Sequence, residues 1–188
     1  MAEQVGAGQI NSSPRRIIGF PDTVNDVAAR SVAAGVLTIA IVAVTTRQAW
    51  LAAVLLYGFL ARTLSGPRFS PLGQLATRLI APRLPNHRKI VPGPPKRFAQ
   101  AIGASFTAAA TGCWLAGEST AALVLLAVLS LPALLEAAFG YCVGCKLFAV
   151  LMGLGVIPES TCETCADIYG PKAKALRAAN RTAIPLEH

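Results

Sequence analysis

Long apolar stretches alternate with short polar or basic segments along this chain. A transmembrane helix needs about 20 mostly apolar residues, and four stretches meet or approach that length: 27–46, 48–64, 98–117 and 119–140. None has the continuous polar face that a surface helix of a soluble protein carries. The pattern therefore predicts an all-α fold, a polytopic membrane bundle of four transmembrane helices.

Two further segments have apolar residues at helical spacing but are too short or too basic to cross a membrane. In residues 69–84, arginines line one side of the predicted helix, which is typical of an amphipathic helix lying in the membrane interface. The uncharged run 147–158 would be about 18 Å long as a helix, so we expect a re-entrant or interfacial helix. We predict a single membrane domain, 27–165, between a flexible N-terminus (1–26) and a basic tail (166–188).

Composition supports the membrane interpretation. Of the 188 residues, 54% are apolar and 14% are charged, and the net charge is +8. Soluble domains usually have about 25% charged residues. An ordinary soluble domain, a disordered chain and a disulfide-dense small domain are all poor matches to these values.

The basic residues indicate an orientation. With four spans, all but Arg47 of the 17 lysines and arginines fall on one side, mainly in the loop 65–97 and near the two ends of the chain. The positive-inside rule places that loop and both termini in the cytoplasm. Anionic lipid headgroups would attract the loop at about 1 kcal/mol per basic residue. Few aromatic residues accompany it, so we expect no nucleic-acid partner. Arg30 and Arg62, near the ends of their spans, are expected to reach the headgroups.

The candidate chemistry lies in two Cys-x-x-Cys pairs, Cys142/Cys145 and Cys162/Cys165, which we expect on the cytoplasmic face and close together. As redox dithiols, they would be activated by a helix N-terminus, and Lys146 would add positive charge. As four thiolates, they have the spacing of a structural zinc site, and the protein would be a non-enzymatic membrane scaffold. A role in packing alone is the third alternative.

Other polar residues of the predicted spans could support such a site. Glu136 lies near the cytoplasmic end of the fourth span, and an ionisable residue at that depth is a functional candidate. We expect Glu136 to pair with Arg97 on the third span, with Gln100 adding a hydrogen bond. A quinone is a conceivable acceptor beside the first pair, although no residue requires one. Cys113 stands alone and is expected to pack.

Two motifs carry a resemblance to a known family. Gly140-Tyr-Cys-Val-Gly-Cys145, followed by a second cysteine pair, and Pro95-Lys-Arg-Phe-Ala-Gln100 resemble the bacterial membrane family called domain of unknown function 4395. The resemblance extends from about Asp22 to Cys165. It implies a small multi-pass protein of the bacterial inner membrane, sometimes encoded beside thioredoxin-like or rhodanese-like proteins. It brings no assigned reaction.

The leading hypothesis is a membrane-embedded thiol protein that exchanges electrons or sulfur with a soluble thioredoxin-like or rhodanese-like partner. Cys142 or Cys145 would attack and the other would resolve the mixed disulfide, while Cys162 and Cys165 would relay electrons. Whether the protein is an enzyme stays open; if it is, a thiol–disulfide oxidoreductase is expected. A transporter is less favoured, because the spans offer few polar residues to line a path.

Overall fold

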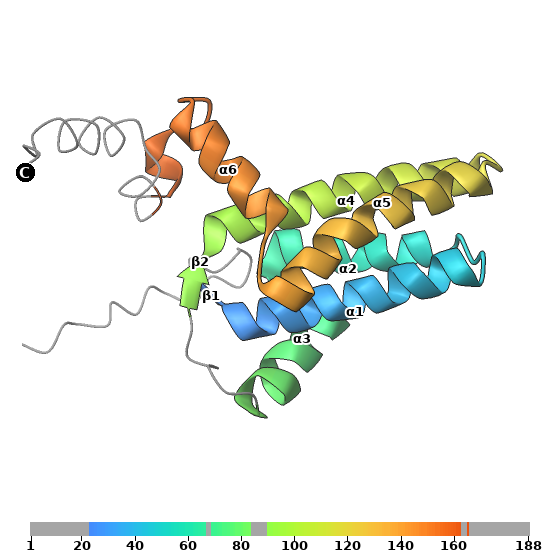
Figure 1. The fold of residues 1–188 in the computed structure, drawn as a ribbon, viewed down its shortest axis with the longest axis horizontal. Coiled ribbons are helices and arrows are strands. Elements are labelled where there is room, and N and C mark those ends of the chain that lie inside the picture. The colour runs from blue at the N-terminus through green and yellow to red at the C-terminus, as the bar shows by residue number, and fades with distance from the viewer. Residues whose placement is uncertain (1–22, 67–68, 84–89, 163–164, 166–188) are drawn as a thin grey trace, which may run out of the picture.

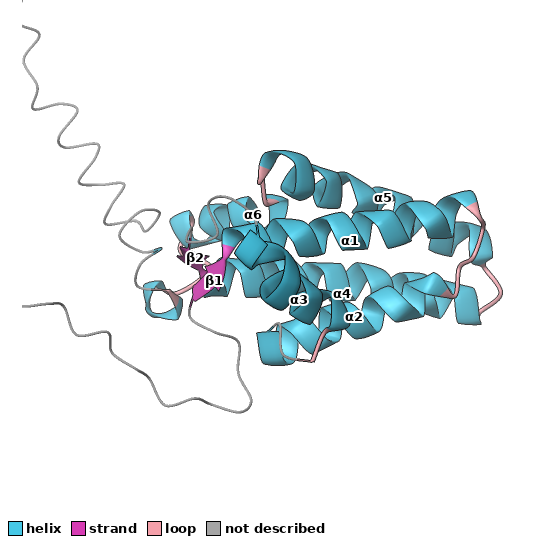
Figure 2. Ribbon diagram, turned by 90° about the horizontal axis from the view of Figure 1, so that it is seen from below, coloured by secondary structure: helices cyan, strands magenta, loops and turns pink. Residues whose placement is uncertain are grey.

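The computed structural model describes residues 23–66, 69–83, 90–162 and 165, so most of the predicted flexible N-terminus and the whole basic tail lie outside the described residues. Four long helices run side by side along the molecule (Figure 1): α1 (Asp26–Thr45), α2 (Leu51–Ser65), α4 (Gly93–Leu115) and α5 (Ser119–Phe139). α1 packs mainly against α5, and α2 mainly against α4, giving two layers (Figure 2). The all-α prediction is confirmed.

The two ends of this bundle differ. At one end, which we call the turn end, residues 46–50 join α1 to α2 and residues 116–118 join α4 to α5. The opposite end, the cysteine end, carries all the other described elements. These include a short antiparallel pair of strands, β1 (Thr23–Asn25) and β2 (Ile90–Pro92), in which Val24 lies opposite Val91. The hydrophobic pattern does not predict this pair of strands.

Local sequence explains where the bundle helices begin. The side chain of Asn25 accepts a hydrogen bond from the backbone N of Ala28, 3.0 Å away, and so caps α1. α4 begins at Gly93, five residues before the predicted span, with Pro94 and Pro95 in its first turn. Proline suits that turn because its missing N–H would have no helical partner there. The helix therefore includes residues that precede the predicted apolar span.

The basic loop contains the helix predicted over 69–84. It consists of α3 (Pro71–Leu75), a π-helical turn η2 (Ala76–Ile80) and a 3-10 turn η3 (Ala81–Arg83). Leu72 packs against Gly35 of α1, which fixes the segment beside the bundle. Leu75 and Leu79 are exposed instead, so this helical segment presents apolar side chains outward.

Only two of the described helices, α1 and α5, are long and apolar enough to cross a membrane. α2 is apolar, but its 15 residues span about 22 Å. α4 has 23 residues, with Lys96, Arg97 and Gln100 in its first two turns. Four membrane spans were predicted, and two of the described helices meet the length and composition of a span.

Many of the buried residues of the bundle are small, and many of its large apolar residues are exposed. Ala40, Ala43 and Ala52 have no exposed surface, whereas Val124 and Leu131 on α5 are 56% and 62% exposed. Small buried residues allow close approach of helix backbones, as in membrane bundles. Exposed apolar side chains of similar size also lie on α2, among them Leu60 and Leu64.

Candidate functional site: a thiol pair at the cysteine end

The end of α5 sets the position of the first cysteine pair. Gly140 caps this helix in a left-handed conformation (φ 68°), which glycine adopts without strain. Arg30 of α1 donates hydrogen bonds to the last carbonyls of α5, with Nη2 2.8 Å from Ala138 O and 3.2 Å from Ala137 O. Arg30 thus caps α5, whereas the sequence suggested that it reaches the headgroups. The chain turns here and begins α6.

α6 runs from Val143 to Gly153, so the predicted short apolar helix exists but begins four residues earlier and ends five residues earlier. Cys142 is its N-cap residue and Cys145 lies in its first turn. Gly144 allows the turn to approach α4 closely, because an added Cβ would lie 2.6 Å from the Cβ of Ala99. The first cysteine pair is therefore held against the start of α4.

The two thiols of this pair form a single unit. Their sulfur atoms are 2.7 Å apart, and Cys145 donates its hydrogen to Cys142. This hydrogen bond, together with the positive charge of Lys96, lowers the pKa of Cys142 against the opposing effects of burial and Glu136. The same hydrogen bond raises the pKa of Cys145. Cys142 is therefore the buried member of the pair with the lowered pKa, and Cys145 is the half-buried member with the raised pKa.

The charged partner of Glu136 is Lys96, and the expected pair with Arg97 is absent. Lys96 Nζ and Glu136 Oε1 form an ion pair, with side chains 9% and 14% exposed. Arg97 points elsewhere and donates from Nε to the carbonyl of Thr63, 3.1 Å away. Successive helical residues point about 100° apart, so only one of these two bases can face the bundle interior. The predicted partner, Arg97, was therefore wrong, and Lys96 is the residue that faces Glu136.

Lys146 is not the cation beside the thiols either. Its Nζ lies over the ring of Tyr141, 5.6 Å from the ring centroid. The positive charge that acts on Cys142 comes from Lys96, about 50 positions away in the sequence. The predicted supporting cation was therefore misplaced, because adjacency in sequence did not translate into proximity to the sulfur.

A second buried basic residue, Arg62, lies near the Lys96–Glu136 ion pair. Arg62 of α2 is 4% exposed, its Nε donates to Gln100 Oε1 (2.8 Å) and its Nη1 donates to Ser70 Oγ (2.9 Å). Arg62 does not extend to the headgroups as predicted. Gln100 does join the polar group of this end, but through Arg62 and not through Arg97. Among the described residues, Arg62 Nη2 is buried without a hydrogen-bond partner.

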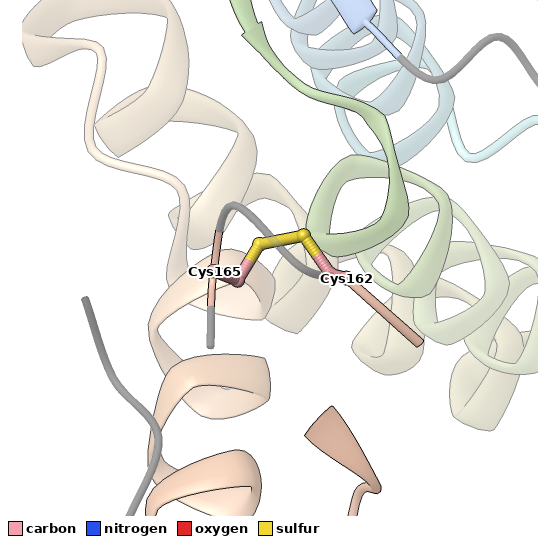
Figure 3. Close-up of a disulfide and its surroundings, with 2 residues drawn as sticks. All are labelled: Cys162 and Cys165. Carbon is pink, nitrogen blue, oxygen red and sulfur yellow. A yellow bond between two sulfur atoms is a disulfide. The ribbon is translucent and has the colours of Figure 1, made fainter. Parts of the chain in front are cut away.

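The second cysteine pair has a different state. Cys162 and Cys165 form a disulfide, with a Cα–Cα distance of 5.2 Å, after the 3-10 turn η4 (Glu159–Thr161) (Figure 3). It packs in an apolar cluster with Phe148 and Met152 of α6. Both pairs thus lie along α6, one at its N-terminus and one on the side that bears Phe148 and Met152.

The geometry gives the zinc hypothesis no support. No group of three or more cysteine, histidine or acidic side chains is placed to hold a metal ion in the part of the chain that the structure describes, which includes all four paired cysteines. Two of the four thiols that a zinc site would need are joined in the disulfide. A thiol pair and a separate disulfide are the arrangement to explain.

Comparison with protein families identifies the class of this chain. Residues 24–153 match the model of the family described as domain of unknown function (DUF4395), and the chain belongs to that family. The predicted resemblance is confirmed. The matched region includes Cys142 and Cys145 and ends before Cys162. Searches of curated proteins and of solved structures found no match.

Proposed function

We propose that the protein is a membrane protein whose Cys142/Cys145 pair exchanges electrons with a soluble thioredoxin-like or rhodanese-like partner. The observation that carries this proposal is the pairing of the two sulfurs at the N-terminus of α6, 2.7 Å apart, with Cys145 donating to Cys142. A helix N-terminus and a nearby cation are the surroundings of reactive cysteines. The Cys162–Cys165 disulfide packs instead in the apolar cluster with Phe148 and Met152.

The difference between the two thiols gives each a role. In the oxidised pair, a partner thiolate attacks the more exposed sulfur, Cys145, forming a mixed disulfide while Cys142 leaves as the thiolate. A thiol of lower pKa leaves faster. The second thiolate of the partner then attacks the partner's sulfur in the mixed disulfide. This attack releases the sulfur of Cys145, which takes a proton. The partner becomes a disulfide, the pair becomes a thiolate and a thiol, and two electrons have moved.

The membrane placement is part of the proposal. All four bundle helices would lie in the bilayer, with α1 and α5 as complete spans and α2 and α4 completing the bundle. Trp50 and Trp114 flank the turn end, which suits aromatic residues at a membrane interface. The basic residues gather at the cysteine end, which we therefore assign to the cytoplasmic side of the bacterial inner membrane, with both termini there.

The helical segment 71–83 and α6 would lie along the cytoplasmic interface. Both present apolar side chains outward, among them Leu79 on the first, and Leu147 and Val150 on α6. This arrangement gives a soluble partner access to Cys145 from the cytoplasm. It also places the basic residues Arg78 and Arg83 near anionic headgroups.

Purified protein in lipid nanodiscs and thioredoxin as the probe would test the exchange. We expect the Cys142→Ser/Cys145→Ser variant to insert normally and to lose all exchange, while Cys113→Ser, a lone cysteine in α4, exchanges at the normal rate. Unchanged exchange in the double variant would contradict the proposal. So would one zinc per chain with four thiols protected until chelation, which is the signature of the alternative scaffold.

A further inference from the structure

A cavity of about 340 Å³ lies against the first cysteine pair. All four bundle helices and the start of α6 contribute to its walls. It extends from the middle of the bundle, at Val36, Phe106 and Val128, to Cys142 and Gly144 at the cysteine end. Its volume lies within the range of small-molecule sites.

The lining is apolar except toward the cysteine end. There it includes the carboxylate of Glu136, the amide of Gln100 and the thiol of Cys142. Gln100 already uses its carbonyl oxygen to accept from Arg62, so its amide nitrogen is the donor offered to a ligand. The chemistry fits a molecule with an apolar body and one polar end that lies beside a sulfur.

We propose that this cavity binds a membrane quinone and that the quinone oxidises the Cys142/Cys145 pair. The inference rests on the function proposed above and names the oxidant that resets the pair after each exchange. Cys142 Sγ bonds to a ring carbon of the quinone. The Cys145 thiolate then attacks Cys142 Sγ, so the S–S bond forms, the C–S bond breaks and the electron pair stays on the ring. The ring takes one proton from Cys145 and one from solvent, giving quinol and the disulfide.

Position distinguishes a quinone from other oxidants. Glutathione disulfide and soluble proteins arrive through water and need no apolar cavity beneath the thiolate, and oxygen is too small to need a cavity of this volume. Cys142 is the buried member of the pair and lines the cavity, whereas Cys145 is the more exposed one. The ion-paired ammonium of Lys96 lies close enough to act on Cys142 and would stabilise negative charge that develops on a reduced ring. Each thiol therefore has its own reactant, the quinone for Cys142 and the partner for Cys145.

Anaerobic oxidation of the reduced protein tests the inference. Protein in nanodiscs would be mixed with ubiquinone-1, whose fully substituted ring resists stable addition of thiols. We expect one quinol per chain by ultraviolet absorbance, and a new Cys142–Cys145 disulfide by peptide mapping. The Cys142→Ser variant should give neither.

A variant that fills the cavity assigns the site. Ala133 lines the cavity one turn before Glu136, whereas Ala127 lies on the same helix, is exposed and does not line it. We expect Ala133→Phe to slow quinol formation about tenfold or more, because the added ring occupies the space of the quinone head. Ala127→Phe should leave the rate unchanged. Val36→Phe, from α1, repeats the test if Ala133→Phe does not fold.

Thioredoxin exchange, measured without quinone on the same samples, separates this inference from the function on which it rests. Exchange without quinol formation would overturn the quinone site and leave the exchange function intact. Equal rates of quinol formation in Ala133→Phe and the parent would contradict quinone binding in this cavity. A tightly bound phospholipid that ubiquinone-1 does not displace would contradict it as well. Quinol formation without thioredoxin exchange would support the quinone site and contradict the proposed partner.

Discussion

The two Cys-x-x-Cys pairs have the same spacing and opposite surroundings. Cys142 and Cys145 are free thiols at a helix N-terminus, within reach of the Lys96–Glu136 ion pair and beside a cavity. The second pair is a disulfide, 7% exposed at Cys162 and 1% at Cys165, in an apolar cluster. Spacing alone allows both pairs to form disulfides, whereas among the described residues a cation and a cavity lie beside the first pair and an apolar cluster surrounds the second.

The groups that distinguish the first pair come from other parts of the chain. Arg30 caps the helix that leads into it, Ala99 receives Gly144, and Lys96 supplies the charge. A perturbed thiol beside a cavity is characteristic of a functional site. The second pair instead packs with its nearest α6 residues, which favours a structural role in holding the chain after η4 against that helix.

Replacing each pair in turn should give the largest contrast. Loss of the first pair abolishes exchange, as argued above, whereas Cys162→Ser/Cys165→Ser should retain exchange within about threefold, because neither sulfur reaches a reactant in our interpretation. That variant should instead lose stability, by about 2 kcal/mol for a disulfide that closes so short a loop. Exchange kinetics with thioredoxin and denaturant unfolding measure the two effects.

The same variant tests the relay role that the sequence suggested for the second pair. A relay requires Cys162 and Cys165 to be reduced and reoxidised in each cycle. If exchange stops in Cys162→Ser/Cys165→Ser while the protein still folds, the two pairs act in series and the structural interpretation is wrong.

A smaller but specific effect is expected at Gly144. A Cβ there would lie 2.6 Å from Ala99 Cβ and 2.7 Å from Ala99 Cα, and the backbone of α4 cannot move aside cheaply. We expect Gly144→Ala to displace the start of α6 and to slow exchange by about 10- to 100-fold, the range that a displacement of about 1 Å produces. The Cys162–Cys165 disulfide should still form, as peptide mapping would reveal.

Gly112 provides the matched control, since a Cβ built there meets nothing within 4 Å. Gly112→Ala should leave exchange unchanged and stabilise α4 by up to about 1 kcal/mol through helix propensity. If Gly144→Ala exchanges as fast as Gly112→Ala, close contact with α4 does not position the thiols.

Much of the architecture could be predicted from hydrophobic pattern alone. The predicted spans 27–46 and 119–140 agree with α1 and α5 to within a residue at each end. An even number of antiparallel helices returns the chain to the end from which it started. Both cysteine pairs were therefore expected at the end that carries the basic loop, where the structure has them. Such features depend on local periodicity and on charge counts along the chain, which one sequence contains in full.

The details of the site depend on helix phase and on contacts between distant segments. Lys96 and Arg97 are neighbours of equal charge, and only packing against α5 determines which of them meets Glu136. Arg62 could not be recognised as buried before its partners Gln100 and Ser70 were placed. The cavity was also unpredictable, because its walls come from five helices whose packing the sequence pattern does not specify.

The smallest predicted effect concerns the charges around Cys142. Because Lys96 lowers the pKa of Cys142 and Glu136 raises it, Lys96→Gln and Glu136→Gln should shift that pKa in opposite directions. A lower pKa means that the thiolate is present at lower pH, so the pH midpoint of Cys142 alkylation by iodoacetamide should rise in Lys96→Gln and fall in Glu136→Gln. A shift of about one pH unit is the size expected for one nearby charge. Peptide mass spectrometry would follow Cys142 specifically.

Arg97→Gln is the matched control for this charge effect, since Arg97 bonds to the carbonyl of Thr63 and does not act on the thiol. Its alkylation midpoint should equal that of the parent, and the Cys162–Cys165 pair should stay unreactive in all three variants. Shifts in the same direction for Lys96→Gln and Glu136→Gln would mean that loss of either partner loosens the site and exposes the thiol. In that event the ion pair positions Cys142 by packing, and the difference between the two cysteine pairs would be one of rigidity more than of charge.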